Sequence, residues 1–333
     1  MIKALAAFEP KGKLKPFEYD PGELNYNEVE IDVQFCGLCH SDISVIDNEW
    51  GHTQYPVVAG HEIVGTVAQL GPGVNQFEVG QIVGLGWNKG FCNECKPCNT
   101  GHKNLCQDAK KTILGNHGGF ADKIRAQANS VISIPEGIDL ESAGPLFCAG
   151  ISVFNPLVQF NIQPTDKVAV IGIGGLGHLA LQFFRAWGCE VTAFTSNDSK
   201  KEEALNLGAH HTLDSCNPSI IENVESKFDF ILSTVNVKLD WNLYLSMLKP
   251  QGRFHFVGAT LDPIDINAFP MIMGQYSVSG SPGGSPSTIS EMLDFSKRHN
   301  IKPIIERYGF HEIEEALDKV RNGDARYRVV LCR

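Results

Sequence analysis

The chain has 333 residues, a formal net charge of −10 and 43% hydrophobic residues. This length exceeds what a single hydrophobic core usually fills, so we expect two domains. No apolar stretch approaches the length of a membrane helix, and the acidic charge argues against nucleic-acid binding, which favours a basic surface. The first residues, Met1–Phe8, lack the basic start and apolar core of a secretory signal. We therefore expect a cytoplasmic protein without membrane or nucleic-acid partners.

The first half of the chain is predicted to be rich in β-strands. Short runs with alternating apolar and polar residues occur at 29–35, 63–70 and 81–85. Turns that contain glycine and proline separate these runs, as is typical of a sheet with short connections.

Four cysteines lie within fifteen positions of this half: Cys92, Cys95, Cys98 and Cys106. The spacing C-x2-C-x2-C-x7-C lets a short lobe, about residues 88–108, fold its thiolates around one tetrahedral zinc ion. Such a site has no open position for substrate or water, so it stabilises a lobe without catalysing a reaction. Four unrelated thiols or two disulfides are the alternative, but a chain without an export signal seldom carries a disulfide framework.

From about residue 165 the pattern changes to strands that alternate with helices. Apolar strands are expected at 167–171, 190–194, 228–232, 252–257 and 275–279, and a helix is expected at 176–187. Repeated strand–helix units with nearly continuous apolar strands predict a parallel, doubly wound α/β sheet.

A glycine-rich turn follows the first of these strands. Its sequence, Gly172-Ile173-Gly174-Gly175-Leu176-Gly177, matches G-x-G-x-x-G between a strand and a helix, the context typical of dinucleotide binding. Gly172 permits the tight turn, Gly174 lets backbone amides approach a pyrophosphate, and Gly177 allows close packing of helix and strand. The whole turn, Gly175 and Leu176 included, is predicted to contact the cofactor, because the helix start faces the phosphate charge. A merely tight turn is the alternative interpretation.

The end of the second strand predicts which dinucleotide is bound. An NAD enzyme usually carries Asp or Glu there to bind the ribose 2′-hydroxyl. This chain has Thr195, Ser196 and Asn197, with Lys201 soon after. Hydroxyls, an amide and a lysine accept a 2′-phosphate that a carboxylate would repel, so NADP(H) is the predicted cofactor. Asp198 keeps NAD(H) as an alternative, because a small shift of the loop would place it on a 2′-hydroxyl.

The tail follows a segment rich in glycine, proline and serine at 282–286, which is typical of a domain boundary. We expect helices at 288–299 and near 312–321, and a closing strand at 327–331. The tail is expected to return to the first domain rather than form a third.

Three further places offer metal ligands. Cys39 lies in Cys39-His40-Ser41-Asp42, His61 lies in Gly60-His61-Glu62, and Cys148 lies near the junction of the two domains. A cysteine–histidine–cysteine set with one open position is the pattern of a catalytic zinc site. Spacing alone does not join ligands over a hundred residues apart, and each has a plainer alternative. Cys148 could be a buried apolar thiol and His61 a hydrogen-bonded core histidine.

The order and spacing of these motifs resemble those of the zinc-containing medium-chain alcohol dehydrogenases over essentially the whole chain. The resemblance is closest to the cinnamyl-alcohol-dehydrogenase-like branch, and within it to bacterial NADPH-dependent aldehyde reductases. The segments that carry it are Gly37–Asp42, Gly60–Glu62, the cysteine lobe, Gly118–Ala121, Gly172–Gly177, Thr195–Asn197 and Ala325–Arg328.

The resemblance implies an α/β fold with two domains. Residues 1–152 and 287–333 would form a β-rich GroES-like catalytic domain, and residues 153–286 a Rossmann domain with a doubly wound parallel sheet. It also implies a homodimer in which edge strands near 275–279 of two subunits pair.

The resemblance also implies a catalytic zinc ion held by Cys39, His61 and Cys148, so that each chain binds two zinc ions, one catalytic and one structural. Glu62 is similar to a residue that sits behind the metal or ligates it transiently; an ordinary ion-pairing carboxylate is the alternative. Asp42 is similar to a carboxylate that supports a metal ligand.

Two residues are expected to serve substrate and cofactor. Ser41 is similar to the hydroxyl that hydrogen-bonds the substrate oxygen and passes its proton, and His40 to a residue that contacts the cofactor pyrophosphate. Many relatives complete the proton path with a histidine five positions after the first cysteine ligand, where this chain has Ser44. Either Ser44 or the nearby His52 is a candidate to complete it.

The substrate pocket is expected to include Trp50, Trp87 and Ile113, which fall in segments that line the pocket in similar enzymes. Aromatic walls suit medium-chain or aromatic aldehydes. Core packing of the same side chains is the alternative.

The function implied is that of a zinc-dependent NADPH:aldehyde reductase, which transfers hydride from the nicotinamide to a zinc-polarised aldehyde carbonyl and accepts broad aliphatic or aromatic aldehydes. One alternative is an NAD-dependent secondary-alcohol or polyol dehydrogenase. A zinc-free quinone reductase of the same architecture is disfavoured because both ligand sets are present. A zinc-ribbon interaction module is disfavoured by the dinucleotide motif and the acidic charge.

Overall fold

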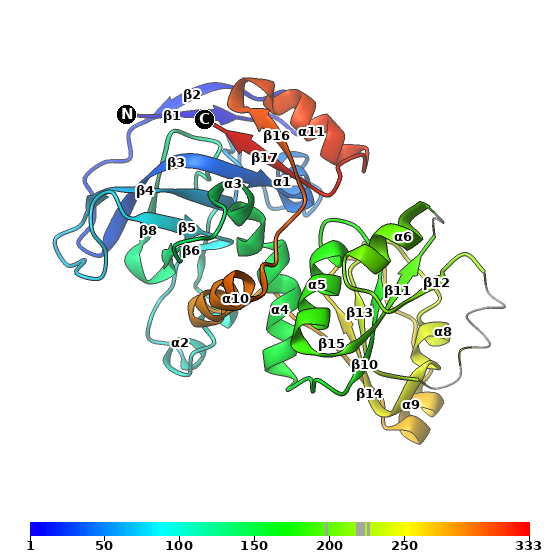
Figure 1. Cartoon of the computed structure of the whole chain (residues 1–333). Coiled ribbons are helices and arrows are strands. Elements are labelled where there is room, and N and C mark those ends of the chain that lie inside the picture. Colours follow the sequence, from blue (N-terminus) through cyan, green and yellow to red (C-terminus); the bar gives the residue numbers. More distant parts are fainter. Residues whose placement is uncertain (197–198, 218–223, 225–226) are drawn as a thin grey trace. The chain divides into compact units, whose positions relative to one another are not determined.

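The computed structural model describes residues 1–196, 199–217, 224 and 227–333, which form two compact units (Figure 1). The first unit comprises Met1–Ile151 and Gly284–Arg333, and the second comprises Ser152–Gly283. Among the described residues, no helix is both long and apolar enough to cross a membrane.

The first unit is built on a mixed sheet whose central strand is β3. The strand order is β16–β17–β3–β4–β5–β9, with β8 also pairing with β3, and only β16 and β17 pair in parallel. The strands span Glu28–Leu38 (β3), Glu62–Leu70 (β4), Ile82–Leu85 (β5), Lys123–Gln127 (β8), Ile132–Ser133 (β9), Ile305–Gly309 (β16) and Arg328–Cys332 (β17). The pairing of β17 with β3 joins the C-terminal segment to the N-terminal half of the chain.

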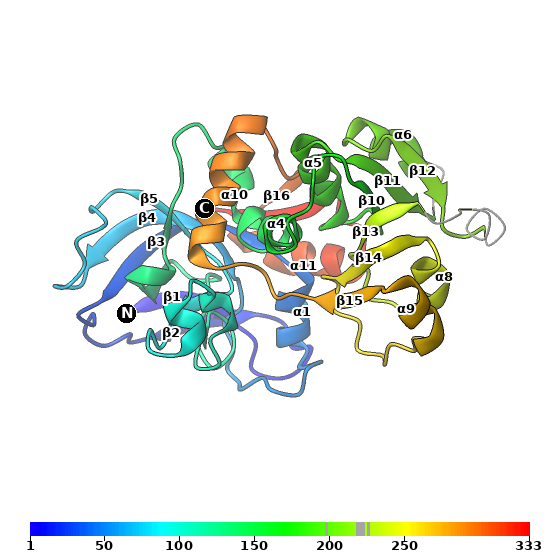
Figure 2. The same ribbon diagram turned by 90° about the horizontal axis from the view of Figure 1, so that it is seen from below.

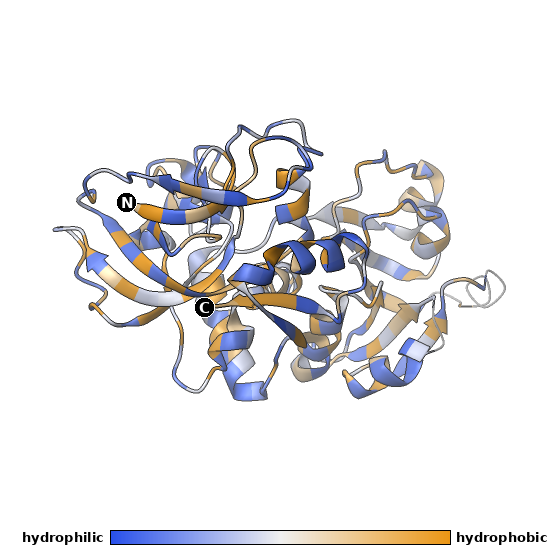
Figure 3. Cartoon of the chain, turned by 90° about the horizontal axis from the view of Figure 1, so that it is seen from above, coloured by the Kyte–Doolittle hydropathy of each residue, from blue (hydrophilic) through white to orange (hydrophobic). Residues whose placement is uncertain are grey.

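Alternating side chains explain why these segments form strands around one core. In β3, Val29, Ile31 and Val33 are buried, and they belong to the same apolar cluster as Ile63 and Val67 of β4. Burying a side chain of this size stabilises the fold by about 1.5–3 kcal/mol. Figure 3 shows hydrophobic and hydrophilic residues alternating along the ribbons, as elements with one buried face require.

The other elements of the first unit are short. Two small antiparallel sheets pair β1 with β2 and β6 with β7. These strands span Ile2–Ala6 (β1), Lys15–Tyr19 (β2), Asn88–Gly90 (β6) and Lys110–Lys111 (β7). The helices are α1 (His40–Ile46), α2 (Lys96–Asn99), α3 (Leu140–Ala143), α10 (Pro286–His299) and α11 (Ile313–Arg321), with 3-10 turns at Lys103–Leu105, Ala128–Ser130, Gly144–Phe147 and Phe310–Glu312.

The ends of α10 follow from local sequence. The Ser285 side chain accepts a hydrogen bond from the Thr288 N–H at 3.3 Å, and Pro286 occupies the first helical position, where no N–H is needed. Asn300 ends the helix in the left-handed conformation with a φ of 52°.

The second unit is a sheet of six parallel strands in the order β12–β11–β10–β13–β14–β15 (Figure 2). The strands span Lys167–Ile171 (β10), Glu190–Thr195 (β11), His211–Asp214 (β12), Phe228–Ser233 (β13), Leu248–Phe256 (β14) and Ser277–Gly280 (β15). Its helices are α5 (Gly177–Trp187), α6 (Ser199–Asn206), α8 (Trp241–Leu245) and α9 (Ala268–Gly274), and α4 (Ala149–Gln159) leads into it. The chain leaves β10 on one side for β11 and resumes on the other with β13, which makes the end of β10 a switch point.

The predicted α/β class with a parallel, doubly wound sheet is confirmed. The strand predicted at 275–279 begins only at Ser277, because α9 ends with Gln275 in the left-handed conformation at a φ of 51°. β12 and β16 were not predicted from the sequence. Their residues are largely polar and half-exposed, so they lack the apolar run on which the strand prediction depended.

A buried histidine in β14 makes the stability of the second unit depend on pH. His255 is fully buried, and its ring nitrogens lie 2.9 Å from the hydroxyls of Ser279 and Ser281. Burial, together with the nearby Arg253 charge, lowers the pKa of His255 to about 4. The folded state therefore holds this ring neutral, whereas an unfolded chain binds a proton below its ordinary pKa of about 6.5.

Stability should fall as the pH drops from about 6.5 towards 4, because the unfolded state binds the additional proton. Wild type should lose unfolding free energy when the pH is lowered from 7 to 5. We expect the loss in His255→Gln to be smaller by about 2 kcal/mol. Urea unfolding followed by circular dichroism at the two pH values measures this difference. Equal losses in both proteins would show that His255 titrates normally in the folded state.

Candidate functional site

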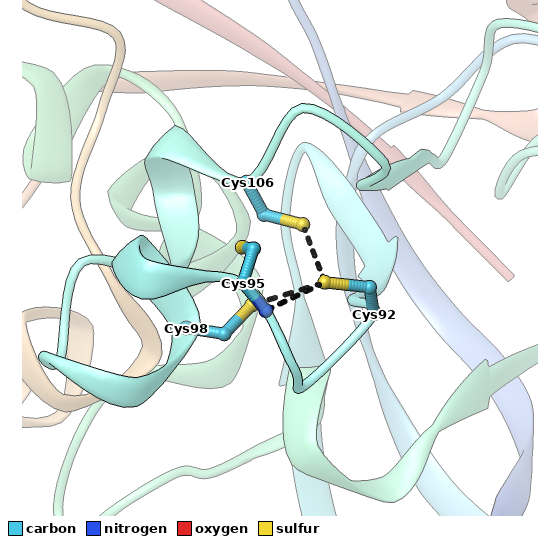
Figure 4. A group of neighbouring side chains, drawn as sticks. All are labelled: Cys92, Cys95, Cys98 and Cys106. Carbon is cyan, nitrogen blue, oxygen red and sulfur yellow. Dashed lines mark hydrogen bonds between the residues drawn. The ribbon is translucent and has the colours of Figure 1, made fainter.

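The cysteine lobe places four sulfur atoms around one point (Figure 4). Cys92 Sγ lies 3.9 Å from Cys98 Sγ and 3.5 Å from Cys106 Sγ, and all four ligand atoms lie within 4.8 Å of one another. A zinc ion bound by four thiolates at about 2.3 Å places neighbouring sulfurs about 3.8 Å apart. The lobe therefore fits a four-sulfur zinc site.

Local chemistry supports this interpretation of the lobe. All four cysteines are free thiols, and backbone N–H groups of Glu94 and Cys95 lower the pKa of Cys92 to about 7. The apolar cluster of the lobe contains only Phe91, two of the cysteines and a few partly buried neighbours. So small a core gives the lobe little stability of its own, and a bound metal would supply it.

A second group of candidate ligands lies in the first unit, at the ends of separate elements. Cys39 precedes α1, His61 precedes β4, and Cys148 follows the 3-10 turn Gly144–Phe147. Cys148 Sγ lies 3.8 Å from Cys39 Sγ and 3.2 Å from His61 Nε2. The fold thus joins a cysteine–histidine–cysteine set that the sequence spreads over more than a hundred positions.

The Asp42 carboxylate fixes two members of this group. It is fully buried, and its Oδ2 accepts the Cys39 backbone N–H at 2.9 Å. Its Oδ1 accepts the Gly60 N–H at 2.8 Å and lies 2.9 Å from His61 Nδ1. A carboxylate at Nδ1 selects the tautomer that carries its hydrogen there, so the Nε2 lone pair remains free on the side of Cys148.

Gly60 is required at the turn that presents His61. Its φ of 93° lies in the left-handed region, and an added Cβ would lie 2.6 Å from the Phe120 ring. Only glycine adopts this conformation without strain. The conformation directs the Gly60 N–H toward Asp42.

Glu62 and Arg328 form a buried ion pair behind the candidate ligands. Arg328 donates to Glu62 Oε1, and Glu62 Oε2 has no partner among the described residues. Burial raises the pKa of Glu62, while the Arg328 charge opposes that shift. One buried carboxylate oxygen therefore remains available within the group that also contains Cys39, His61 and Cys148. Sequence reasoning gave Arg328 no role, although an arginine in an otherwise apolar closing strand was the signal.

The two thiols of this group share one hydrogen bond, and their pKa values move in opposite directions. The hydrogen bond from Cys148 holds the pKa of Cys39 well below its usual range, and the same bond together with burial raises the pKa of Cys148. A divalent cation would stabilise both thiolates. The donor set, two sulfurs and one imidazole with a carboxylate behind them, is the one expected for zinc with an open position.

The aromatic residues predicted for the substrate pocket separate into two environments. The Trp87 ring packs edge-on against His61 at 5.0 Å between centroids, and Trp50 lies 6.0 Å from Trp87. Both tryptophans are partly exposed, whereas Ile113 is fully buried in the apolar core of the unit.

The residues expected to handle protons lie on or beside α1. His40 is exposed at the first position of the helix and Ser41 is half-buried next to it. Ser44 is buried, and its hydroxyl donates to Glu49 Oε2 at 2.6 Å. Glu49 is exposed, so this hydrogen bond leads from the helix interior to solvent. His52 is an exposed loop residue, and sequence reasoning missed Glu49 because nothing in the spacing marks it.

The glycine-rich turn lies at the switch point of the second unit. Gly172 has a φ of 87°, and a Cβ on Gly177 would lie 1.9 Å from the Gly172 carbonyl oxygen. Thr234 Oγ1 donates to the carbonyls of Ile171 and Gly172 at 3.0 and 2.8 Å, which fixes the turn. Nothing lies within 4 Å of the Cβ position of Gly174, so space for a phosphate remains beside the backbone.

Gly175 and Leu176 continue this turn, and Leu176 is the N-cap of α5 without a side-chain cap. The N–H groups of His178 and Leu179 already bond the carbonyl oxygens of Gly174 and Leu176 at 3.1 Å, so a phosphate would be bound by the turn that precedes α5. This arrangement fits the pyrophosphate of a dinucleotide.

The candidates for the 2′-phosphate differ in accessibility. Thr195 is buried with 4% exposure at the end of β11, whereas Ser196 is exposed. Lys201 is half-buried in α6. Asn197 and Asp198 lie outside the described residues. No carboxylate ends β11 itself, and Ser196 is the accessible hydroxyl there.

Comparisons with known proteins identify both halves of the chain. The family model for the alcohol dehydrogenase GroES-like domain matches residues 25–136, and the model for zinc-binding dehydrogenases matches residues 175–298. An aldehyde reductase of Synechocystis sp. is 63% identical over 331 residues, which covers 99% of this chain and 98% of the relative.

Two solved structures are similar over nearly the whole chain. A cinnamyl alcohol dehydrogenase of Sorghum bicolor superposes with a TM-score of 0.95 at 36% identity and covers 99% of this chain and 97% of its own. The Helicobacter pylori cinnamyl alcohol dehydrogenase in complex with NADP(H) has a TM-score of 0.91 at 32% identity, with the same coverage.

The role of Asp42 can be tested by replacing its carboxylate with an amide. In Asp42→Asn, at least one of the three donors would face an amide N–H instead of an oxygen. We expect metal affinity at the His61 group to fall about 10- to 100-fold, while the cysteine lobe keeps its metal. Zinc analysis after dialysis against a graded chelator measures this change. Asp32→Asn, which removes a half-exposed partner of Lys123, is the matched control, and equal metal retention in both variants would contradict the assignment.

Proposed function

The chain belongs to the zinc-binding alcohol dehydrogenase family, and we propose that it is an NADPH-dependent aldehyde reductase that interconverts aldehydes and alcohols. The observation that carries the proposal is the buried group of Cys39, His61 and Cys148, a ligand set that leaves one position open. The high identity to an aldehyde reductase along the full chain supports aldehydes as the substrate class.

Cys39, His61 and Cys148 would hold a catalytic zinc ion, and the cysteine lobe would hold a structural one. Held by these three residues, zinc would supply Lewis-acid chemistry toward a carbonyl group. The Trp87 ring packs edge-on against His61, and Arg328 pairs with Glu62 behind the ligands. Asp42 keeps the ligands oriented, so little reorganisation is needed when substrate binds.

NADP(H) is the cofactor we propose for the second unit, which implies that hydride comes from the nicotinamide. The turn at Gly172–Gly177 offers backbone N–H groups and space for the pyrophosphate. Ser196 and Lys201 are the described candidates for the 2′-phosphate, and no acidic residue ends β11 to repel it. The NADP(H) complex of a relative at 32% identity points the same way.

Ser41 is proposed to hydrogen-bond the substrate oxygen and pass its proton, with His40 beside it at the cofactor phosphates. Of the two residues considered for completing the proton path, Ser44 is favoured over His52 by its contact with Glu49. An exposed carboxylate at the end of this hydrogen bond exchanges protons with solvent, the task that a histidine performs in many relatives.

The protein is further proposed to be cytoplasmic and a homodimer. β15 pairs only with β14 among the described strands, and Phe269, Ile272 and Met273 of the preceding α9 are exposed. An open sheet edge beside apolar side chains favours pairing with a second copy. A monomer in light scattering would refute this assembly.

The proposed activity predicts NADPH-selective reduction of aldehydes that depends on His61. Wild type should oxidise NADPH with benzaldehyde and hexanal much faster than NADH, and His61→Ala should abolish turnover while circular dichroism stays unchanged. Absorbance assays that follow the oxidation of each cofactor measure these rates. A preference for NADH would instead support the NAD-dependent secondary-alcohol or polyol dehydrogenase. Turnover in a folded His61→Ala variant would remove the metal assignment.

The proposed proton path predicts that Ser44→Ala and Glu49→Gln lower kcat with little change in KM. Loss of a positioned proton-transfer group typically costs about 10²- to 10⁴-fold, and less where water substitutes. His52→Gln is the matched control and should retain the wild-type kcat. Steady-state kinetics over pH 6 to 9 measures these effects. A lower kcat in His52→Gln alone would assign the proton path to His52 instead of Ser44.

A further inference from the structure

A cavity of about 490 Å³ lies in the first unit, and no residue of the two candidate metal groups lines it. Its rim is formed by exposed polar residues, among them Asp20, Asn25 and Gln54. Ile2, Tyr19, Lys89 and His117 line it from partly or fully buried positions. This volume lies within the range of small-molecule pockets, and the exposed rim lets a ligand enter.

Lys89 is the unusual member of this lining. It lies in β6, and its Nζ makes no hydrogen bond or ion pair with any described residue, in contrast to Lys123, which pairs with Glu30 and Asp32. Burial lowers the pKa of Lys89 to about 8; the Glu28 charge opposes this shift, and the charges of Lys110 and Arg125 add to it. An appreciable fraction of the amine is therefore neutral, and hence nucleophilic, near pH 7.

The other charged groups of the cavity are already engaged. Arg125 donates to Glu30 Oε2 and to the carbonyls of Pro21 and Gly22. Glu28 accepts two hydrogen bonds from Asn25, and Asp20 accepts the Gly22 N–H. With the Lys89 amine neutral, the Arg125 charge faces those of Asp20 and Glu28, so the cavity does not favour an anion. Its free functional group is the Lys89 amine.

His117 adds an uncharged proton carrier to the same cavity. Its buried Nδ1 has no hydrogen-bond partner among the described residues, and its ring packs 4.3 Å from the Tyr19 ring. Burial, together with the Lys89 charge, lowers the pKa of His117, so the imidazole is neutral at pH 7. A neutral imidazole can accept a proton from a nitrogen and return it to an oxygen.

We propose that Lys89 captures aldehydes as a reversible imine in this cavity, at a site separate from the metal groups. The inference rests on the proposed function for the class of ligand, because an aldehyde reductase works in the presence of free aldehydes. A cavity that does not favour an anion and contains a nucleophilic amine suits an uncharged electrophile. Such a site would hold aldehyde covalently without reducing it.

The reaction balances without an added oxidant or reductant. The Lys89 nitrogen forms a bond to the carbonyl carbon while the π electron pair moves to the oxygen. Two protons pass from nitrogen to that oxygen, with His117 as the candidate carrier. The C–O bond then breaks, water leaves, and a C=N bond remains; hydrolysis reverses each step.

Reductive trapping on the full chain tests the proposal directly. The protein is incubated briefly at pH 7 with benzaldehyde and cyanoborohydride, which reduces the imine to a stable benzylamine, and modified lysines are mapped by mass spectrometry. An amine with a pKa of about 8 is neutral roughly 300-fold more often at this pH than an ordinary lysine. We expect labelling of Lys89 to exceed that of any exposed lysine by roughly 100-fold.

Two variants and a pH series separate the outcomes. Lys89→Arg keeps the positive charge but cannot form an imine, so the dominant adduct should disappear, whereas Lys110→Arg on the paired strand β7 should retain it. In wild type, labelling of Lys89 should level off above about pH 8 while that of exposed lysines continues to rise. Uniform labelling of exposed lysines, or an unchanged adduct pattern in Lys89→Arg, would overturn the proposal.

The same experiment on His61→Ala distinguishes this inference from the proposed function. Labelling of Lys89 in a variant without turnover is the expected result, since the cavity contains no metal ligand. If wild type reduces aldehydes but Lys89 is not labelled, the imine site is wrong and the reductase assignment stands. If Lys89 is labelled but no aldehyde is reduced, the imine site stands and the reductase assignment is wrong.

Discussion

The buried carboxylate of Asp42 is the contact on which the candidate catalytic group depends. Its two oxygens receive backbone N–H groups from both sides of the site and face the ring of His61. A buried charge is stable only when hydrogen bonds replace its lost hydration, and here those bonds come from the segments that carry Cys39 and His61. One residue therefore joins the start of α1 to the turn before β4, and stabilises the fold and orients the ligands together.

The two candidate metal groups differ in what surrounds them. The cysteine lobe presents four sulfurs of one short segment and has little apolar core, so its order would come from the metal. The second group draws its ligands from separate elements around the main sheet, beside the large apolar core of the unit. Only this second group has an unpartnered buried oxygen, on Glu62, among its described atoms, and an aromatic ring against its histidine. A stabilising role for the first and a chemical role for the second follow from these surroundings.

Local patterns in the sequence were sufficient for features formed by neighbouring residues. The cysteine lobe and the turn at Gly172–Gly177 depend on short spacings, and strong apolar runs marked β10, β11 and β13. Contacts between distant segments were not predictable in this way. Strand order brings Cys148 close to Cys39 and pairs Arg328 with Glu62. Of these two contacts, the resemblance to known enzymes predicted only the first. The burial of Thr195 and the contact of Ser44 with Glu49 depend on side-chain direction, which spacing does not reveal.

Zinc-edge anomalous diffraction from crystals of the metal-replete protein tests the assignment of the two groups most directly. Two peaks per chain are expected. One should lie among Cys92, Cys95, Cys98 and Cys106, and the other should be bounded by Cys39, His61 and Cys148. A single peak in the cysteine lobe, with the second group free of metal, would contradict a zinc-dependent mechanism and leave the protein with a structural zinc ion alone.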